Sequence, residues 1–129
     1  MKRVALLLLL AAVPLSFAES RERDKATPLE VFDAMHDGFV AEKARGVHAR
    51  YQFNISGPRG GEWWIEVDDG KFRMGRGQIG NADVTIVASD NDWVALSNGK
   101  LSGVWASLSG RLKVRGSPTL ARKLDAMFP

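Results

Sequence analysis

The sequence has no cysteine, and among its 129 residues there are only two histidines. Without cysteine the chain cannot form a disulfide, a thiolate nucleophile or a cysteine-ligated zinc site. His36 lies beside a predicted apolar helix stripe and has no partner motif, so it is interpreted as structural. Because no catalytic cluster and no cluster with metal-ligand spacing remains, we expect neither an enzyme nor a bound cofactor or metal.

An excess of charge of one sign is also missing from most of the chain. The formal net charge is +3, but Lys2 and Arg3 precede residue 19, and residues 19–129 hold 16 basic and 15 acidic side chains. A nearly neutral domain gives no electrostatic reason to expect a nucleic-acid partner.

A long hydrophobic run occurs only at the N-terminus. Lys2 and Arg3 precede an apolar stretch from Val4 to Val13, and the small-x-small sequence Ser16-Phe17-Ala18 follows Pro14. This pattern predicts a signal peptide over residues 1–18 that is cleaved before Glu19, and hence a periplasmic or secreted protein. A retained membrane anchor is the alternative, although the run is shorter than the ~20 residues that span a bilayer.

The rest of the chain reads as one domain after a short lead-in. Residues 19–27 are dense in charge and are predicted to be disordered. Thr27, Pro28 and Glu30 have the order of an N-cap, a first helical residue and a capping-box acid. They predict a helix that ends at Gly46, with an apolar stripe formed by Leu29, Phe32, Met35, Phe39 and Val40.

Strict alternation of apolar and polar residues predicts the strands. Residues 48–55, 62–68 and 71–75 form an antiparallel meander, and residues 83–88 and 111–115 add two more strands. Two short helices lie between the last two strands, and Ser117-Pro118 opens a final helix. The predicted fold is therefore α+β, with two layers, in which helices cover one face of a five-stranded, mainly antiparallel sheet.

Two motifs resemble functional sites but are interpreted as turns. Residues 75–80 spell GxGxxG, yet a strand follows where dinucleotide binding requires a helix N-terminus. Asp68 and Asp69 form a carboxylate pair, but Gly70 follows them, and Asp-Gly is a strong hairpin signal.

The stretch from Asn98 to Gly116 organises the second half of the domain. It contains Gly99-Lys100-Leu101, a short apolar helix around Ala106, and the run from Gly110 to Gly116, which reads GRLKVRG. Together with Asp83-Val84, Ser89-Asp90, Leu120-Ala121 and Lys123-Leu124, this pattern resembles the sterol carrier protein-2 (SCP-2) family over residues 28–128.

The resemblance implies an apolar tunnel between sheet and helices that holds a fatty-acyl, sterol or other apolar ligand without catalysis, with transient membrane contact in addition. Composition alone leaves open whether the large apolar residues form a packed core or line a cavity. The residues expected at the tunnel are Met74, Ile86, Trp93, Leu96, Leu101, Val104, Trp105, Leu108, Leu120, Leu124, Met127 and Phe128.

Two questions stay open within this interpretation. Trp105 is bulky enough to plug the tunnel. An SCP-2-like accessory domain without bound lipid is the alternative function, and Trp64, on the polar face of the sheet, would then be an anchor for a protein partner.

Overall fold

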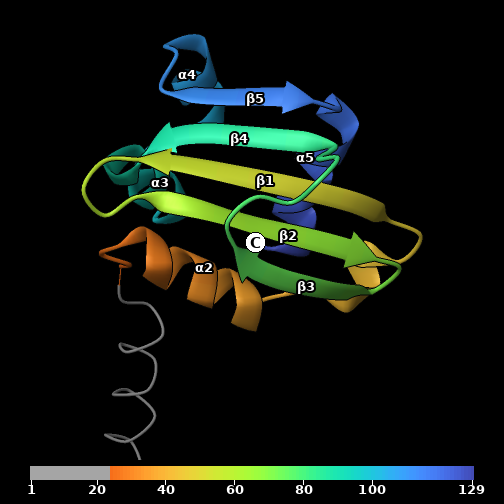
Figure 1. Cartoon of the computed structure of the whole chain (residues 1–129). Coiled ribbons are helices and arrows are strands. Elements are labelled where there is room, and N and C mark those ends of the chain that lie inside the picture. The colour runs from red at the N-terminus through yellow and green to blue at the C-terminus, as the bar shows by residue number, and fades with distance from the viewer. Residues whose placement is uncertain (1–23) are drawn as a thin grey trace, which may run out of the picture.

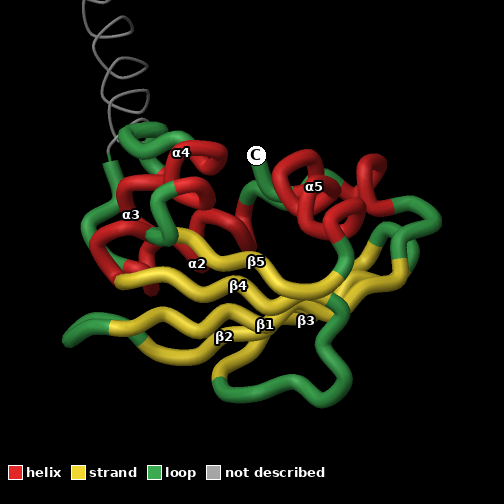
Figure 2. Tube along the Cα trace, turned by 90° about the horizontal axis from the view of Figure 1, so that it is seen from above, coloured by secondary structure: helices red, strands yellow, loops and turns green. Residues whose placement is uncertain are grey.

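A computed structural model describes residues 24–129 of the chain. The predicted signal peptide and its cleavage point lie outside the described residues, as do residues 19–23 of the predicted lead-in. The described part is a sheet with all its α-helices on one face, and the opposite face is bare of helices (Figures 1 and 2). This arrangement confirms the predicted α+β class and its two layers.

The sheet contains five strands in the order β3-β2-β1-β4-β5. Strands β1 (His48–Ser56), β2 (Gly61–Asp68) and β3 (Lys71–Arg76) form the predicted antiparallel meander. Strand β4 (Val84–Ser89) lies parallel to β1, and β5 (Leu112–Gly116) pairs antiparallel with β4. The sheet is therefore mainly antiparallel, and β3 and β5 are its two edges.

Residues 24–129 contain five helical segments, which precede, separate and follow the strands along the chain. Helix α2 spans Pro28–Asp37, and Thr27 is its N-cap as predicted. A 3₁₀ segment, η1, covers Ala41–Ala44. Helices α3 (Asp90–Ser97) and α4 (Gly103–Leu108) connect β4 to β5, and α5 (Pro118–Met127) follows β5 with Ser117 as its N-cap.

The first helix is shorter than predicted. It ends at Asp37 rather than near Gly46, and the N–H of its C-cap, Gly38, donates to the Ala34 carbonyl. The chain turns there because Phe39 leaves the helix direction and packs on Phe72, with ring centroids 4.4 Å apart. Leu29 was wrongly placed in the apolar stripe: it is 51% exposed, and Val31 is buried instead.

Aromatic side chains fill the core between α2 and the middle of the sheet. Phe32 stacks on Trp63 at 4.5 Å and on Trp93 at 5.5 Å, and its edge meets Phe53 at 5.2 Å. Because this region is tightly filled, any space between the two layers lies further toward α3, α4 and α5.

Both motifs interpreted as turns have that role in the structure. Strand β3 ends at Arg76 and β4 begins at Val84, so the GxGxxG sequence is followed by a strand and not by a helix. Asp69 and Gly70 both have positive φ, 45° and 83°, as a tight hairpin requires. Asp69 Oδ1 also accepts a 2.8 Å hydrogen bond from the Gly46 N–H.

Candidate functional site

Two neighbouring cavities lie among the helices on the covered side of the sheet. The larger, of about 650 Å³, lies between α3, α4, α5 and the β4–β5 edge. The smaller, of about 310 Å³, lies between α2, α3 and α5. Trp93, Leu96, Leu124 and Asp125 line both, so the cavities meet between α3 and α5.

The larger cavity is mostly apolar. Its sheet wall consists of Ile86, Leu112 and Val114, and its helical walls come from all three C-terminal helices. Its helix and loop residues are Trp93, Leu96, Leu101, Ser102, Gly103, Val104, Ser107, Leu108, Ala121, Arg122, Leu124 and Asp125. Since Val104 and Leu108 are 73% and 78% exposed, this cavity opens to solvent along α4.

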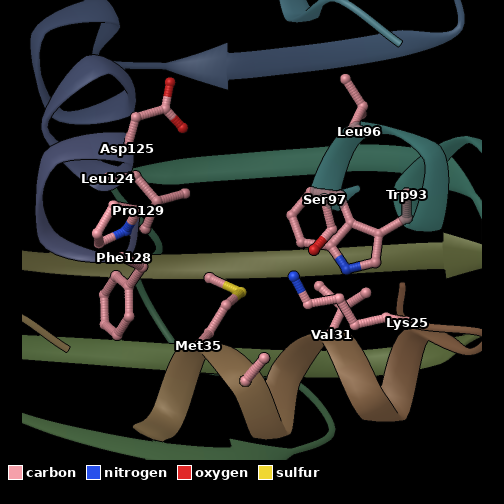
Figure 3. Close-up of a pocket in the computed structure, with 11 residues that line it drawn as sticks. Lys25, Val31, Met35, Trp93, Leu96, Ser97, Leu124, Asp125, Phe128 and Pro129 are labelled. Carbon is pink, nitrogen blue, oxygen red and sulfur yellow. The ribbon is translucent and has the colours of Figure 1, made fainter. Parts of the chain in front are cut away.

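The smaller cavity combines an apolar wall with a few polar groups. Figure 3 shows Val31 and Met35 on α2 facing Trp93 on α3 and Leu124 and Phe128 at α5. The polar groups are the side chains of Lys25, Ser97 and Asp125, which reach the cavity from three different segments.

The start of α3 fixes the position of Trp93. Ser89 caps the helix by accepting a 3.2 Å hydrogen bond from the Asp92 N–H. The carboxylate of Asp90 is buried and accepts from the N–H groups of Arg59, at 3.2 Å, and Asn91, at 2.8 Å. The β1–β2 loop is thereby tied to α3, one turn before the tryptophan.

An ion pair ties α3 to the beginning of β5. The guanidinium of Arg111 donates to Asp92 Oδ1 at 2.7 Å and 3.1 Å. This hydrogen bond lowers the pKa of the Asp92 carboxyl below its usual value, and Asp92 raises the pKa of Arg111 in return. The pair joins the two ends of the segment from Asp92 to Arg111, which contains α4. It therefore anchors both ends of the outer wall of the larger cavity.

Helix α5 is held by two long-range hydrogen bonds, one from strand β1 and one from Val40, which precedes η1. The Tyr51 hydroxyl donates to the Leu120 carbonyl at 2.7 Å, and the Val40 N–H donates to the Met127 carbonyl at 2.8 Å. Burial raises the pKa of Tyr51 to about 12, and the nearby Asp83 charge adds to this effect. These bonds place Leu124 between the two cavities.

Most of the residues expected at a tunnel come together around these cavities. Those that line at least one of them are Ile86, Trp93, Leu96, Leu101, Val104, Leu108, Leu124 and Phe128. Met127 and Leu120 belong to α5 but pack into or against the core instead. Trp105 is 63% exposed and lines neither cavity.

Met74 is separated from the cavities by the strand order. It lies on β3, one edge of the sheet, while Ile86 lies on β4, next to the other edge. The alternation of β3 correctly indicates which face Met74 occupies, but it does not indicate which strands are neighbours.

Several lining residues were not anticipated from the sequence. Met35 was placed in the apolar stripe of the first helix but not at a cavity, and Val31 could have been found from the helical periodicity of α2. Lys25 had no such signal, since it lies in a segment predicted to be disordered. In the structure, the Lys25 N–H donates to Asn98 Oδ1 at 2.9 Å, and the Lys25 carbonyl accepts from Asn98 Nδ2 at 2.8 Å.

Among residues 24–129 there is no group of three or more His, Asp or Glu side chains that could hold a metal ion. Within the same residues, no helix is both long and apolar enough to cross a membrane.

The model of the SCP-2 sterol transfer family matches residues 32–129 of this chain. The chain belongs to that family. The match includes every element that lines the two cavities apart from the first turn of α2 and Lys25. The resemblance inferred from the 98–116 stretch is thus confirmed.

Known relatives of this SCP-2 domain include parts of larger enzymes. Hydroxysteroid dehydrogenase-like protein 2 of Mus musculus is 34% identical over 100 residues, which is 77% of this chain and 20% of that protein. The chain therefore spans about a fifth of the length of this curated relative. The sec-alkyl sulfatase PisA1 of Pseudomonas sp. has the same fold over 80% of this chain and 16% of its own, with 18% identity and a TM-score of 0.72.

A protein of the same fold has been solved with a lipid. Sterol carrier protein-2 from Aedes aegypti, in complex with the C16 fatty acid palmitate, matches 74% of this chain and 92% of its own length. The TM-score is 0.53 and the identity 20%, so this likeness concerns the fold.

Proposed function

We propose that this SCP-2 domain is a non-catalytic lipid carrier that holds a fatty-acyl, sterol or similar apolar ligand between its sheet and its helices. The observation that carries the proposal is the larger apolar cavity, of about 650 Å³, continued by the smaller one past Leu96 and Leu124. Palmitate in a protein of the same fold supports it. Burial of each CH₂ group contributes about 0.8 kcal/mol, so an acyl chain alone gives useful affinity.

The first experiment is identification of the bound lipid. The protein is purified without detergent, extracted with organic solvent, and the extract analysed by mass spectrometry. We expect a chemically narrow lipid at a near-stoichiometric amount. A protein that is empty and also takes up no fluorescent fatty acid would contradict the proposal.

A matched pair of variants tests where the lipid lies. Leu108→Asp introduces a charge into the larger cavity at a side chain that is 78% exposed, so the fold should tolerate it. Leu29→Asp introduces the same charge at a residue that is 51% exposed but lies outside both cavities. We expect Leu108→Asp to lower lipid retention at least fivefold, about 1 kcal/mol, and Leu29→Asp to leave it unchanged. Equal retention by both variants would place the lipid elsewhere.

We further propose that α4 contacts an anionic membrane during lipid exchange. Val104, Trp105 and Leu108 on this helix are all more than half exposed. Residues 93–124, which surround them in sequence, carry six Lys or Arg and no Asp or Glu. Arg111 and Lys100 pair with Asp92 and Asp24, so four of these cations have no salt bridge within residues 24–129. An apolar surface in a cationic segment is complementary to a bilayer with negative headgroups, and the larger cavity opens at the same helix.

Vesicle sedimentation tests the membrane contact. We expect binding to phosphatidylcholine vesicles that contain phosphatidylglycerol, weak binding to phosphatidylcholine alone, and loss of binding in Trp105→Ala/Leu108→Ala. Leu29→Ala is the control, because it removes another exposed leucine far from this segment. Binding that survives both the double substitution and high salt would contradict this surface.

Export from the cytoplasm is part of the same proposal and rests on the sequence of residues 1–18. The intact mass of the protein isolated from its native cell compartment tests it. We expect a chain that begins at Glu19. A cytoplasmic protein that retains Met1-Lys2-Arg3 would contradict export.

An accessory domain without lipid is the second candidate. It is favoured by the relatives in which an SCP-2 region is a small part of a larger enzyme. A protein partner at the polar sheet face would use Trp64, but this side chain is only partly accessible, because its ring lies over Gly75, with the Arg73 guanidinium 5.8 Å from the ring centre. The lipid extraction experiment separates the two candidates.

A further inference from the structure

The indole N–H of Trp93 is a buried donor without an acceptor. In the part of the chain that the structure describes, Nε1 of Trp93 is the one buried side-chain nitrogen or oxygen that has no hydrogen-bond partner. The residue is only 9% exposed and lines the smaller cavity. Buried donors are almost always paired in native proteins, so this group points to an absent acceptor.

A lysine faces the same cavity and its backbone is held in place relative to Trp93. The N–H and carbonyl of Lys25 are both bound by the side chain of Asn98, which caps α3, the helix that carries Trp93. Among residues 24–129 its ammonium has no carboxylate within 4.0 Å. Figure 3 shows that the Lys25 ammonium and the Trp93 indole nitrogen both point into the cavity.

The rest of the cavity determines which ligand group these donors would suit. Val31 and Met35 on α2 form an apolar wall opposite α3, and the Ser97 hydroxyl lies on the same side as the indole. Asp125 lines the cavity from α5, away from Lys25 in Figure 3. An anionic group is therefore attracted to the α3 side and repelled from the α5 side, and a carboxylate has one oxygen for each of the two donors.

We infer that Lys25 and Trp93 bind the carboxylate of a single-chain fatty acid. The acyl chain then runs past Leu96 and Leu124, which line both cavities, into the larger cavity. This orientation rests on the proposed lipid-carrier function and adds to it a preference for the free acid over a neutral lipid. The preference arises because the indole N–H is buried and Lys25 is half-buried, so a carboxylate would replace hydration that these groups partly lack.

The test compares palmitate with methyl palmitate, which has the same chain but no charge. Full-length purified protein is titrated with each ligand by displacement of a fluorescent probe. A hydrogen bond to a charged group contributes enough for about tenfold in affinity, so the wild type should bind palmitate about tenfold more tightly than the ester.

Two conservative variants identify the residues. Trp93→Phe keeps an aromatic ring in the stack with Phe32 but removes the N–H, and Lys25→Met keeps the length of the side chain but removes the charge. Each should reduce the affinity for palmitate about five- to tenfold. Lys25→Met should leave the affinity for the ester nearly unchanged, whereas Trp93→Phe should lower it to a smaller extent, because the ester carbonyl also accepts from the indole N–H. Lys43→Met, in η1 and outside both cavities, is the control and should behave as wild type.

The possible outcomes distinguish failure of the carboxylate site from failure of the proposed lipid-carrier function. If the wild type binds acid and ester equally and no variant changes either, the carboxylate site is wrong but the carrier function stands. If neither ligand binds, both fail. Independently, the indole ¹⁵N–H resonance that disappears in Trp93→Phe should shift on addition of palmitate and not on addition of hexadecane. The same shift with both ligands would overturn the hydrogen bond.

Discussion

The hydroxyl of Tyr51 donates a 2.7 Å hydrogen bond to the carbonyl of Leu120, and so joins the central strand β1 to the first turn of α5. Leu120 lies four residues before Leu124, the apolar residue at which both cavities meet. One hydrogen bond across 69 positions of the chain thus helps to set the position of a cavity wall.

Tyr51 should ionise at unusually high pH. Its pKa is raised to about 12 by burial and by Asp83. Because the unfolded phenol ionises near 10.0, the unfolded state releases its proton first, and stability should fall as pH rises from about 10 to about 12. The sequence contains one tyrosine, so the change in absorbance at 295 nm with pH reports the ionisation of this residue.

The matching variant is Tyr51→Phe, which keeps the ring and loses the hydrogen bond. Its free energy of unfolding at neutral pH should be lower by about 1 kcal/mol, and the specific loss of stability above pH 10 should be absent. A wild-type titration midpoint near 10 in the folded protein would contradict the buried environment.

The ion pair of Asp92 and Arg111 should make stability depend on acid pH. The pKa of Asp92 is lowered in the folded state, mainly by its hydrogen bond with Arg111. The stabilisation is therefore present above the unfolded pKa, near 3.8, and is lost as pH falls through the lower folded value. Thermal melts of wild type and Arg111→Gln should differ at pH 6, and the difference should be smaller at pH 2.

Arg45→Gln is the control for this measurement, since Arg45 is exposed and makes no salt bridge within residues 24–129. It should melt like the wild type at both values of pH. A constant difference between Arg111→Gln and wild type at all values of pH would mean that the arginine acts by packing and not through the carboxylate.

Gly75 should be intolerant of a side chain because of Trp64. The two residues are partners across β2 and β3, and a Cβ at residue 75 would lie 2.5 Å from the Trp64 ring. Gly75→Ala should therefore destabilise the protein by about 1–3 kcal/mol. In the Trp64→Ala background the same substitution should cost much less, as measured by a double-mutant cycle in urea. Additive effects would exclude the steric conflict.

Gln52 should be needed for the order of the β3–β4 loop. Its amide is buried on the polar face, where Oε1 accepts from the Ile79 N–H at 2.9 Å and Nε2 donates to the carbonyls of Trp63 and Gly77, each at 3.1 Å. Gln52→Leu leaves these groups unpaired and should cost about 2 kcal/mol or more. Hydrogen exchange at Ile79 should accelerate strongly, while Lys113→Leu, at an exposed position on the edge strand β5, should change it little.

Local signals in the sequence were sufficient to predict most elements of this fold. N-caps at Thr27 and Ser117 and the hairpin at Asp69-Gly70 were identified because each depends on a few adjacent residues. The helix end at Asp37 was missed because it depends on Phe39 packing against Phe72, a contact between distant segments.

The candidate site was predictable only in part, for the same reason. Periodicity indicates that Met74 and Ile86 face the covered side, but the strand order β3-β2-β1-β4-β5 separates them. Trp105 was expected at the tunnel because the family resemblance implied it, yet its side chain on the short helix α4 is 63% exposed. Lys25 has no periodic signal, since its position depends on one asparagine 73 residues away.

The burial of residues 124–128 has a consequence for the order in which the protein can fold. Leu124, Met127 and Phe128 belong to the same core as Tyr51 and Phe53 on β1. During synthesis α2 and the meander of β1 to β3 leave the ribosome first, and the part of the apolar face that α5 covers stays exposed until α5 emerges. The domain should therefore complete its core only after nearly the whole described chain has been made, and chaperones would find their binding sites on the nascent sheet before that point.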